Sequence, residues 1–545
     1  MLNSKSLFSV YFLLICTFLI LSGCYKKEFG KLTLANAQPE YLYPLLDAQL
    51  NLGDIVDPNK KKLFITTDTT GFYTFTYYNN LFQQYITDLL KIADININQS
   101  VSLTAPEVAS LPVSGSVTQN FANSFTLATT NGEQLKTITL KSGNIPFNIS
   151  STFKQNIQIT ITFPYITKNS IPLSKIITMN YGGSVPLASN NTIDLTGYTI
   201  DLSQNNTTVN TISYTATLKV NYIAGNPIST TQKISISTGL SGLQYSYAAG
   251  YIGQYTITIP KDTVSINLFD NAYAGNIFFT NPVVEAIITN SVGAPSEVKI
   301  NTLTALSNIN GTTPITGTEI NTNIPIAYPP TQQSAAMQTI IALDNTNSNV
   351  QTVFNPAPNK IIYQMTGTVN PAGNTGSLNF VTDSSKIAVE GQVEIPMEGK
   401  VTKFVLLDTI TGMTYPSLTI SGSQVSIQKA GFNINLQNGF PLDAIIQMYF
   451  LDKNNKVIDS LFDTGSQLIA SGQIDVNGKV ISPTNTLIKD LFTQQRYTNI
   501  TTNSTTAVLF AFFRTANNGT VPVKIYSSYQ IKANIGIDLQ ANVSF

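Results

Sequence analysis

The sequence predicts a mainly β protein with two or more antiparallel β-sandwich-like or long curved-sheet modules and few short helices. Composition is the first sign, because Thr, Ile, Tyr and Phe, which favour strands, and Asn and Ser, which favour turns, dominate the chain. Alternation is the second: apolar and polar residues alternate along 157–163, 212–222 and 255–268, as in sheets with one buried and one solvated face. The hydrophobic content of 42% argues for a folded chain rather than a disordered one.

The N-terminus predicts a lipoprotein signal peptide over residues 1–23. Lys5 precedes the apolar run Leu7–Leu21, which is short for a membrane-spanning helix. The residues "LSGC" that follow resemble the bacterial lipobox, whose cysteine is acylated after the chain is cut before it. This resemblance implies that Cys24 is a membrane anchor, with residues 24–40 as a tether. Because Cys16 leaves with the signal, we expect no disulfide in the mature chain.

The residues directly after Cys24 predict the location to which the lipoprotein is sorted. Lys26 and Glu28 resemble the Lys-plus-acidic tag that sends some Bacteroidota lipoproteins to the outer face of the outer membrane. In that tag the acidic residues sit in tandem, whereas here Lys27 takes one of their places. We therefore expect a lipid-anchored, surface-exposed protein, with a periplasm-facing lipoprotein as the alternative.

The mature chain is long enough for several domains. The polar, proline-ended stretch 307–330 predicts a linker between an N-terminal β module, 41–306, and a C-terminal β module, 331–545. A helix is expected near 80–92, where apolar residues fall at helical spacing, with a pair of strands as the alternative. Alternation from Val523 to Phe545 predicts a very long last strand. Such a strand also resembles the closing strand of an outer-membrane barrel, an interpretation that the lipobox opposes.

Missing residue types exclude whole classes of chemistry. The chain has no His, so Ser-His-Asp catalysis, Cys-His catalysis and His-ligated zinc are excluded. Lys plus Arg and Asp plus Glu number 30 each, so no basic excess exists to hold nucleic acid. The residue types present leave carboxylate-pair, Lys or Tyr catalysis and an oxygen-ligated metal open. We nevertheless expect no enzyme, no cofactor and no metal, with a carboxylate-based hydrolase as the alternative.

Three stretches contain candidate site residues. Asp452, Asn454 and Asp459 resemble part of a calcium loop, but Lys456 falls at a ligand position, so "KNNK" predicts a hairpin turn. Three glutamates at every fourth position predict the wet face of one strand rather than a catalytic pair; they are Glu390, Glu394 and Glu398. "YSYAAGYIGQY", 245–255, predicts a curved strand, with an exposed ligand contact as the alternative.

Two segments resemble uncharacterised outer-membrane lipoproteins of Bacteroidota. They are "PEYLYPLLDAQLNLGDIV", 39–56, and "NFVTDSSKIAVEGQVEIPMEG", 379–399. That family implies no activity for this chain. Four Asp-Ser/Thr pairs, three of them followed by an apolar residue and one by Thr70, also resemble the O-glycosylation pattern of that group, which implies Thr69, Thr263, Thr409 and Ser460 as acceptors.

We therefore expect a non-catalytic binding or scaffolding module on the outer membrane. Its expected partners are the membrane, through acylated Cys24, and another outer-membrane protein, a lipid or a glycan. The alternative is a tubular lipid-binding-type protein that holds an apolar ligand between long curved sheets.

Overall fold

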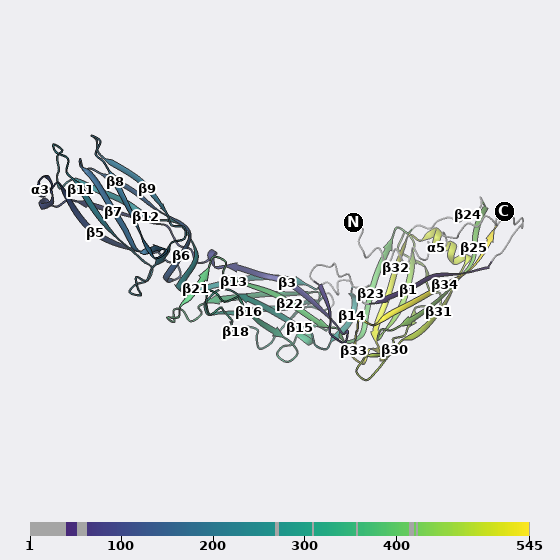
Figure 1. Cartoon of the computed structure of the whole chain (residues 1–545). Coiled ribbons are helices and arrows are strands. Elements are labelled where there is room, and N and C mark those ends of the chain that lie inside the picture. The colour runs from purple at the N-terminus through teal and green to yellow at the C-terminus, as the bar shows by residue number, and fades with distance from the viewer. Residues whose placement is uncertain are drawn as a thin grey trace.

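The computed structural model describes residues 40–51, 63–266, 272–307, 310–355, 358–413, 419–420 and 423–543. Figure 1 shows an elongated molecule with three β modules in series. We name them the distal sandwich, the middle sandwich and the terminal module. None of the helices among these residues is long and apolar enough to cross a membrane.

The distal sandwich, residues 95–251, has two four-stranded layers, β4-β12-β6-β9 and β5-β11-β7-β8, in which every pair is antiparallel. Strand β10 pairs with both β6 and β7 and so joins the layers at one end. Alternating residues fill the space between the layers, as shown by Phe147 of β6, whose ring centroid lies 6.4 Å from that of Phe163 of β7. The elements are β4 (Ile95–Ser102), α3 (Ala105–Ser114), β5 (Ser116–Thr126), β6 (Gln134–Ser151), β7 (Asn156–Lys168), β8 (Ile171–Met179), β9 (Leu187–Asp194), β10 (Thr199–Asp201), β11 (Thr211–Asn221) and β12 (Lys233–Tyr251).

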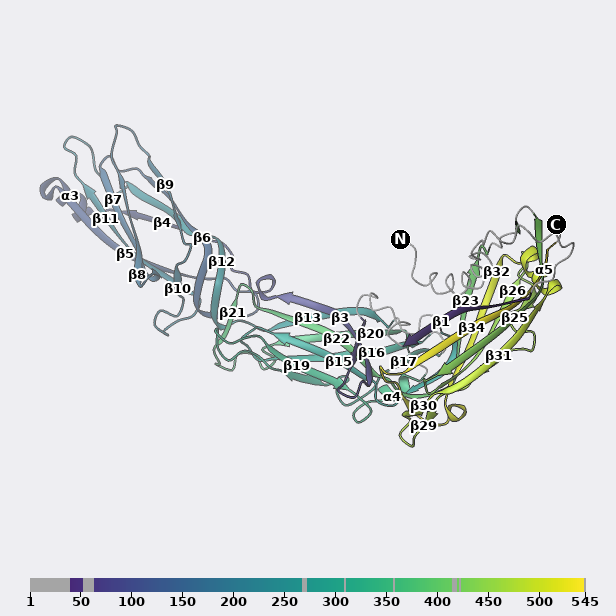
Figure 2. The same ribbon diagram turned by 45° about the vertical axis from the view of Figure 1, so that its right-hand side comes forward.

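The middle sandwich has one sheet in the order β19-β15-β22-β3-β2 and a second built on β13-β20-β16, with β17 and β18 both paired to β16. Its strands run along the length of the molecule (Figure 2). The elements are β2 (Leu63–Thr67), β3 (Tyr73–Tyr85), η2 (Ile86–Asp88), β13 (Tyr255–Ser265), β15 (Val283–Asn290), β16 (Ser296–Ser307), β17 (Gly311–Pro314), β18 (Asn323–Ile326), β19 (Met337–Leu343), α4 (Val350–Val353), β20 (Lys360–Val369) and β22 (Lys386–Pro396). Between β20 and β22 in sequence, β21 (Asn379–Thr382) pairs with β12 of the distal sandwich.

The terminal module has one sheet with β1-β34-β25 in sequence and β31 beside β25, and a second with the order β14-β23-β32-β26-β27. Both sheets curve (Figure 2). The elements are β1 (Glu40–Asn51), β14 (Ala272–Phe279), β23 (Glu398–Thr411), β24 (Thr419–Ile420), β25 (Ser423–Asn438), β26 (Leu442–Leu451), β27 (Val457–Ser460), β28 (Gln467–Ile469), β29 (Gln473–Ile474), β30 (Val480–Ser482), β31 (Thr484–Thr493), α5 (Gln494–Asn503), β32 (Thr506–Thr515), η4 (Asn517–Gly519), β33 (Val523–Lys524) and β34 (Gln530–Val543).

The chain runs out along the molecule and returns. It starts in the terminal module with β1, passes the middle sandwich as β2 and β3, and builds the distal sandwich from β4 to β12. It then completes the middle sandwich, with β14 contributed to the terminal module on the way, and ends in the terminal module, where β34 pairs with β1. Both ends of the described chain therefore belong to the same module, and the distal sandwich is made from the interior of the sequence.

The structure confirms the predicted fold class, and alternation located β7, β11 and β13 correctly. The helix expected near 80–92 is wrong. β3 extends to Tyr85 and pairs with β22, and only three residues of 3-10 helix follow. The reason is a register shift: Val389 pairs with Phe82 and Glu390 with Asn80, so Leu81 is an extra residue that imitates helical spacing.

The expected division into two modules and a linker differs from the observed one. Within 307–330, β17 and β18 pair with β16 and belong to the middle sandwich. Residues 40–51 lie in the terminal module rather than with the strands that follow them. Because the chain goes out and back, neighbours in sequence are divided between modules, which a boundary drawn along the sequence does not capture. The expected last strand is interrupted between Lys524 and Gln530.

Candidate functional site

The predicted anchor, Cys24, and the predicted sorting residues, Lys26 and Glu28, lie outside the described residues. The chain enters the described structure at Glu40, whose position can be followed across the sheet. Glu40 pairs with Gln540, Gln540 with Lys429, and Lys429 with Thr493. This row marks the end of the terminal module farthest from the other two modules (Figure 1). Fifteen intervening residues separate Cys24 from Glu40 in the sequence.

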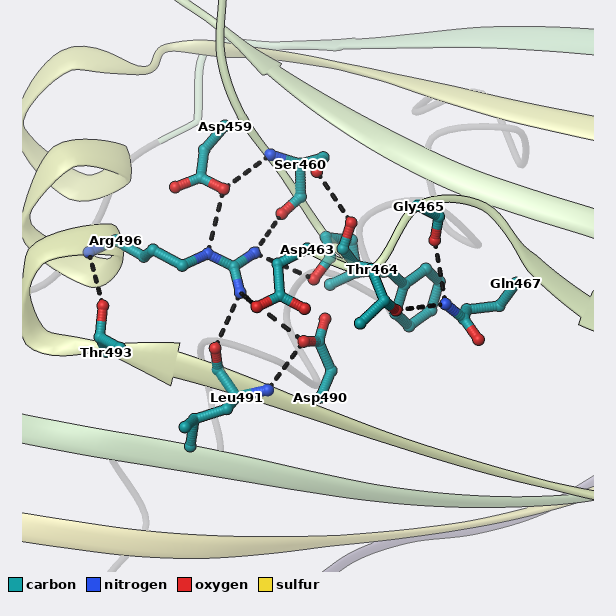
Figure 3. Close-up of polar contacts among 12 residues, drawn as sticks. Asp459, Ser460, Asp463, Thr464, Gly465, Gln467, Asp490, Leu491, Thr493 and Arg496 are labelled. Carbon is teal, nitrogen blue, oxygen red and sulfur yellow. Dashed lines mark hydrogen bonds and ion pairs between the residues drawn. The ribbon is translucent and has the colours of Figure 1, made fainter.

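Helix α5 begins beside this row and carries the most concentrated polar cluster of the described chain (Figure 3). The hydroxyl of Thr493 caps the helix by accepting from the backbone N–H of Arg496. The guanidinium of Arg496 donates from Nη2 to the carbonyl of Ser460 at 2.6 Å and from Nη1 to the carbonyl of Leu491 at 2.8 Å. Its Nε donates to Asp459 Oδ1 at 3.2 Å. One arginine therefore fastens α5 to both β27 and β31.

Two further carboxylates face the same guanidinium. Asp463 and Asp490 each lie 3.6 Å from Arg496 Nη1. Burial raises the pKa of the Asp490 carboxyl, and the neighbouring Asp463 raises it further, although Arg496 opposes both. The Arg496 plane also lies 4.2 Å from the centre of the Phe492 ring. Since carbonyls, carboxylates and a ring already surround the cation, the cluster has the features of a structural ion network rather than of an open reaction site.

The residues that resemble part of a calcium loop have two different structural roles. Asp452 Oδ1 accepts from the backbone N–H of Asn454 at 2.8 Å and of Lys456 at 2.9 Å, which closes the hairpin turn between β26 and β27. Asp459 instead pairs with Arg496. The predicted hairpin is confirmed, and the three candidate ligands are not brought together.

The three regularly spaced glutamates are also separated. Glu390 and Glu394 lie on β22, whereas Glu398 begins β23 and lies 3.6 Å from Lys524. Burial raises the pKa of Glu285 on the adjacent strand, and Glu394 adds to the rise. Among the described residues no three His, Cys, Asp or Glu side chains are placed to hold a metal ion.

The middle sandwich encloses a cavity of about 40 Å³ between its two sheets. Apolar side chains line most of it, among them Leu81, Ala286 and Met365. Drug-sized ligand pockets have volumes of roughly 300–1,000 Å³, so this space is far too small for a lipid tail. The buried apolar side chains of the distal and middle sandwiches form one continuous hydrophobic core.

A buried hydrogen-bond network joins the distal sandwich to the middle one. The Tyr255 hydroxyl, at the start of β13, donates to Glu133 Oε1 at 2.7 Å. The Glu133 carbonyl accepts from the amide of Asn210 at 2.7 Å, and the Asn370 amide donates to the Gly253 carbonyl at 2.7 Å. Burial disfavours the Glu133 carboxylate, but the bonds from Tyr255 and from the backbone N–H of Asn131 outweigh it and hold the pKa of Glu133 below its usual value. The network therefore lies at the connection from β12 to β13.

A second junction joins the middle sandwich to the terminal module. The backbone N–H of Tyr73 donates to the Ile525 carbonyl at 3.1 Å, and that of Ile525 donates to the Met397 carbonyl at 3.0 Å. Around these bonds Tyr526 and Tyr529 stack edge-on with centroids 5.5 Å apart. The segment that interrupts the expected last strand is thus the one that builds this junction.

The far end of the distal sandwich is formed by helix α3 and the connections β6–β7, β8–β9 and β11–β12. The caps of α3 are complete: Thr104 and Glu107 form a capping box, and Gly115 ends the helix with φ of 73°. Val113 of α3 is 90% exposed. This end presents exposed loops and one helix on a filled β core, which is a common arrangement for binding surfaces.

The predicted glycosylation residues differ in the solvent exposure of their side chains. Thr69, Thr263 and Thr409 are exposed. Ser460 is half-buried, and its hydroxyl donates to the Phe462 carbonyl at 2.9 Å. In the Tyr-rich stretch, Tyr245 and Tyr255 are buried, but the predicted single curved strand is wrong: β12 ends at Tyr251, and β13 begins at Tyr255 in another sheet.

Sequence reasoning missed Arg496, Glu133 and Asn210. A usable signal existed for the first, because Arg496 and Arg514 are the only arginines in the chain. Both pair with aspartates, Arg514 with Asp443 at 2.9 Å. No sequence signal linked Glu133 to Tyr255, which lies 122 residues away.

No protein-family model matches the chain, and no curated protein matches it. Among solved structures, a Parabacteroides distasonis protein thought to be secreted is similar at 13% identity and a TM-score of 0.28, covering 54% of this chain and 89% of that one. The VP2 subviral particle of infectious bursal disease virus is similar at 10% identity and a TM-score of 0.14, covering 81% of this chain and 82% of that one. Similarities this weak carry no argument about function.

Proposed function

We propose that this chain is a lipid-anchored protein of the outer membrane that holds the distal sandwich away from the membrane as a non-catalytic binding or scaffolding module. The observation that carries the proposal is the position of Glu40. It lies at the end of the molecule opposite the distal sandwich, and the predicted anchor, Cys24, precedes it by a short tether.

The two junctions support this role. Each is closed by buried or backbone hydrogen bonds, and β12 alone, with 19 residues, corresponds to about 60 Å of extended strand. A tether attached at one end and tight junctions along the length keep the far loops at a fixed distance from the anchor. Lipidation raises the local concentration of membrane partners, so a weak contact suffices for function.

The filled cores favour this function over the lipid-binding alternative. In the described residues the cavity between the middle sheets has a volume of about 40 Å³, which leaves no room for an acyl chain. The Arg496 guanidinium and the Glu133 carboxylate are each paired with groups of the chain itself, so neither supports the hydrolase.

The test compares two epitope insertions in intact cells. One is placed between Gly182 and Gly183, in the distal β8–β9 loop, and the other in the hairpin at Lys453, near the predicted anchor. We expect antibody and added protease to reach the distal epitope, and we expect Cys24→Ala to release the chain from the membrane fraction. Full protection of both epitopes in intact cells would instead indicate a periplasm-facing protein, and a Cys24→Ala chain that stays membrane-bound would contradict the anchor.

A further inference from the structure

One sheet edge of the middle sandwich lacks the features that keep other edges from pairing. Strand β19 is the outer strand of its sheet and, in the described chain, forms a ladder only with β15. Its seven residues, "MQTIIAL", include no charge, proline or glycine. An edge strand presents unpaired backbone N–H and C=O groups, which are a template for another strand.

Several other outer strands carry such features, and β2, at the opposite edge of the same sheet, is uncharged but has only five residues. β1 has Pro44 and an adjacent register shift, β8 has Pro172, and β31 has Lys489. β13 has a register shift between Ile259 and Asp262. β4 and β5 are uncharged, but they are bridged to each other by Asn123, which donates to Gln99 at 3.1 Å.

The side chains of β19 favour association as well. Ile340 is 57% exposed and points to the same face as Ile287, with which it is in register on β15. Met337 is 40% exposed. A partner strand would remove both apolar side chains from water, which is favourable.

We propose that β19 pairs antiparallel with β19 of a second copy of this chain, extending the five-stranded sheet to ten strands. With Ile340 at the centre, Ile340 faces its own counterpart and Gln338 faces Ala342. No like charges meet anywhere along the paired strands. The Ala342 carbonyl already accepts from Asn347 at 2.8 Å, and its second lone pair remains for the partner.

This symmetry sets the orientation of the two molecules. A two-fold axis perpendicular to the strands makes two identical edges antiparallel, and backbone donors then face acceptors. A two-fold axis along the strands would instead place donors opposite donors and acceptors opposite acceptors. Because the strands of the middle sandwich run along the molecule, paired copies point in opposite directions (Figure 2). Copies anchored in two facing membranes would satisfy this geometry. Only this last step rests on the proposed function; the strand pairing does not.

The test introduces Ile340→Cys into the full chain. In the expected mature protein the one other cysteine is the acylated Cys24. Opposed Cα atoms of an antiparallel pair lie about 4.5–5.5 Å apart, which a disulfide spans. Ile176→Cys is the matched control, because Ile176 is 59% exposed on another outer strand, β8. Disulfide dimers are measured on the purified chain and on mixed cells carrying two different epitope tags.

We expect disulfide dimers for Ile340→Cys in both settings, including dimers that contain both tags, and at least tenfold fewer for Ile176→Cys. Adding Lys at this edge, with Ile340→Lys, should reduce association of the chain at least tenfold. Absence of the dimer from the purified chain, or a disulfide to a different protein, would overturn pairing between copies. Dimers in the purified chain and on cells, but never with mixed tags, would overturn the pairing between copies in two facing membranes. Purified dimers from a chain that is protease-protected in cells would support the pairing and contradict the proposed surface location.

Discussion

The Tyr255→Phe variant tests the network that joins the distal and middle sandwiches. It removes a single hydroxyl, which donates to a carboxylate only 3% exposed. Hydrogen bonds to charged groups contribute about 1.5–3 kcal/mol, so we expect the free energy of unfolding of the distal sandwich to fall by that amount at pH 7. Urea unfolding followed by circular dichroism measures it. Tyr78→Phe is the control, because Tyr78 is 38% exposed and packs its ring against Phe64.

The pH dependence distinguishes the loss of this bond from a general loss of packing. The pKa of Glu133 is lowered in the folded chain, so the carboxylate contributes stability above its ordinary value of 4.5 and loses it as the pH falls through the lowered value. Tyr255→Phe lacks the hydrogen bond to the Glu133 carboxylate, so part of this pH-dependent stabilisation is already absent from the variant at pH 7. The difference between wild type and Tyr255→Phe should therefore shrink between pH 7 and pH 3. An equal difference at both pH values, or a difference below about 0.5 kcal/mol at pH 7, would refute this reasoning.

Three further perturbations address the middle and terminal modules. Ala286→Val places two methyl groups at the wall of the cavity and should raise the free energy of unfolding of the middle sandwich by about 1 kcal/mol in urea titrations. Ala342→Val, on the outer face of the same sheet, is the control and should change this free energy by less than about 0.5 kcal/mol. Arg496→Met leaves Asp459 and Asp490 without their cation and should cost about 3–5 kcal/mol, measured as faster hydrogen exchange in α5, with Lys453→Met as the exposed control. The pKa of Asp490 is raised above the ordinary 3.8, so the folded chain favours its neutral form and stability is lost as the pH rises through the raised value. Asp490→Asn should flatten this loss in free energies of unfolding measured from pH 4 to pH 8. An unchanged pH profile would contradict the raised pKa of Asp490.

Local alternation predicted strands well where the ladder is regular. β7 and β11 pair without interruption over residues 156–162 and 215–221, and both followed from the sequence. β3 did not, because the extra residue Leu81 breaks the two-residue period inside the strand. Bulges of this kind are set by the partner strand, which a single segment of sequence does not reveal.

Long-range pairing accounts for the rest of what the sequence did not predict. β1 and β34 pair although they come from opposite ends of the chain, so the terminal module contains residues from both. The same applies to the polar clusters. Arg496 meets Asp459 and Asp490 only after β27, β31 and α5 have packed together, and Tyr255 meets Glu133 only at a junction between modules. Residue types alone indicate neither meeting.

The central claim is that the distal sandwich stands away from the membrane while α5 lies near it. Energy transfer from a single labelled cysteine to a membrane dye tests this most directly in the lipidated chain, with the label at Gly182→Cys in the distal β8–β9 loop or at Thr498→Cys on α5. The longest strands of the terminal, middle and distal modules have 16, 13 and 19 residues, and each corresponds to more than about 40 Å. We predict efficient transfer at Thr498 and almost none at Gly182. Equal transfer at both positions would contradict the account.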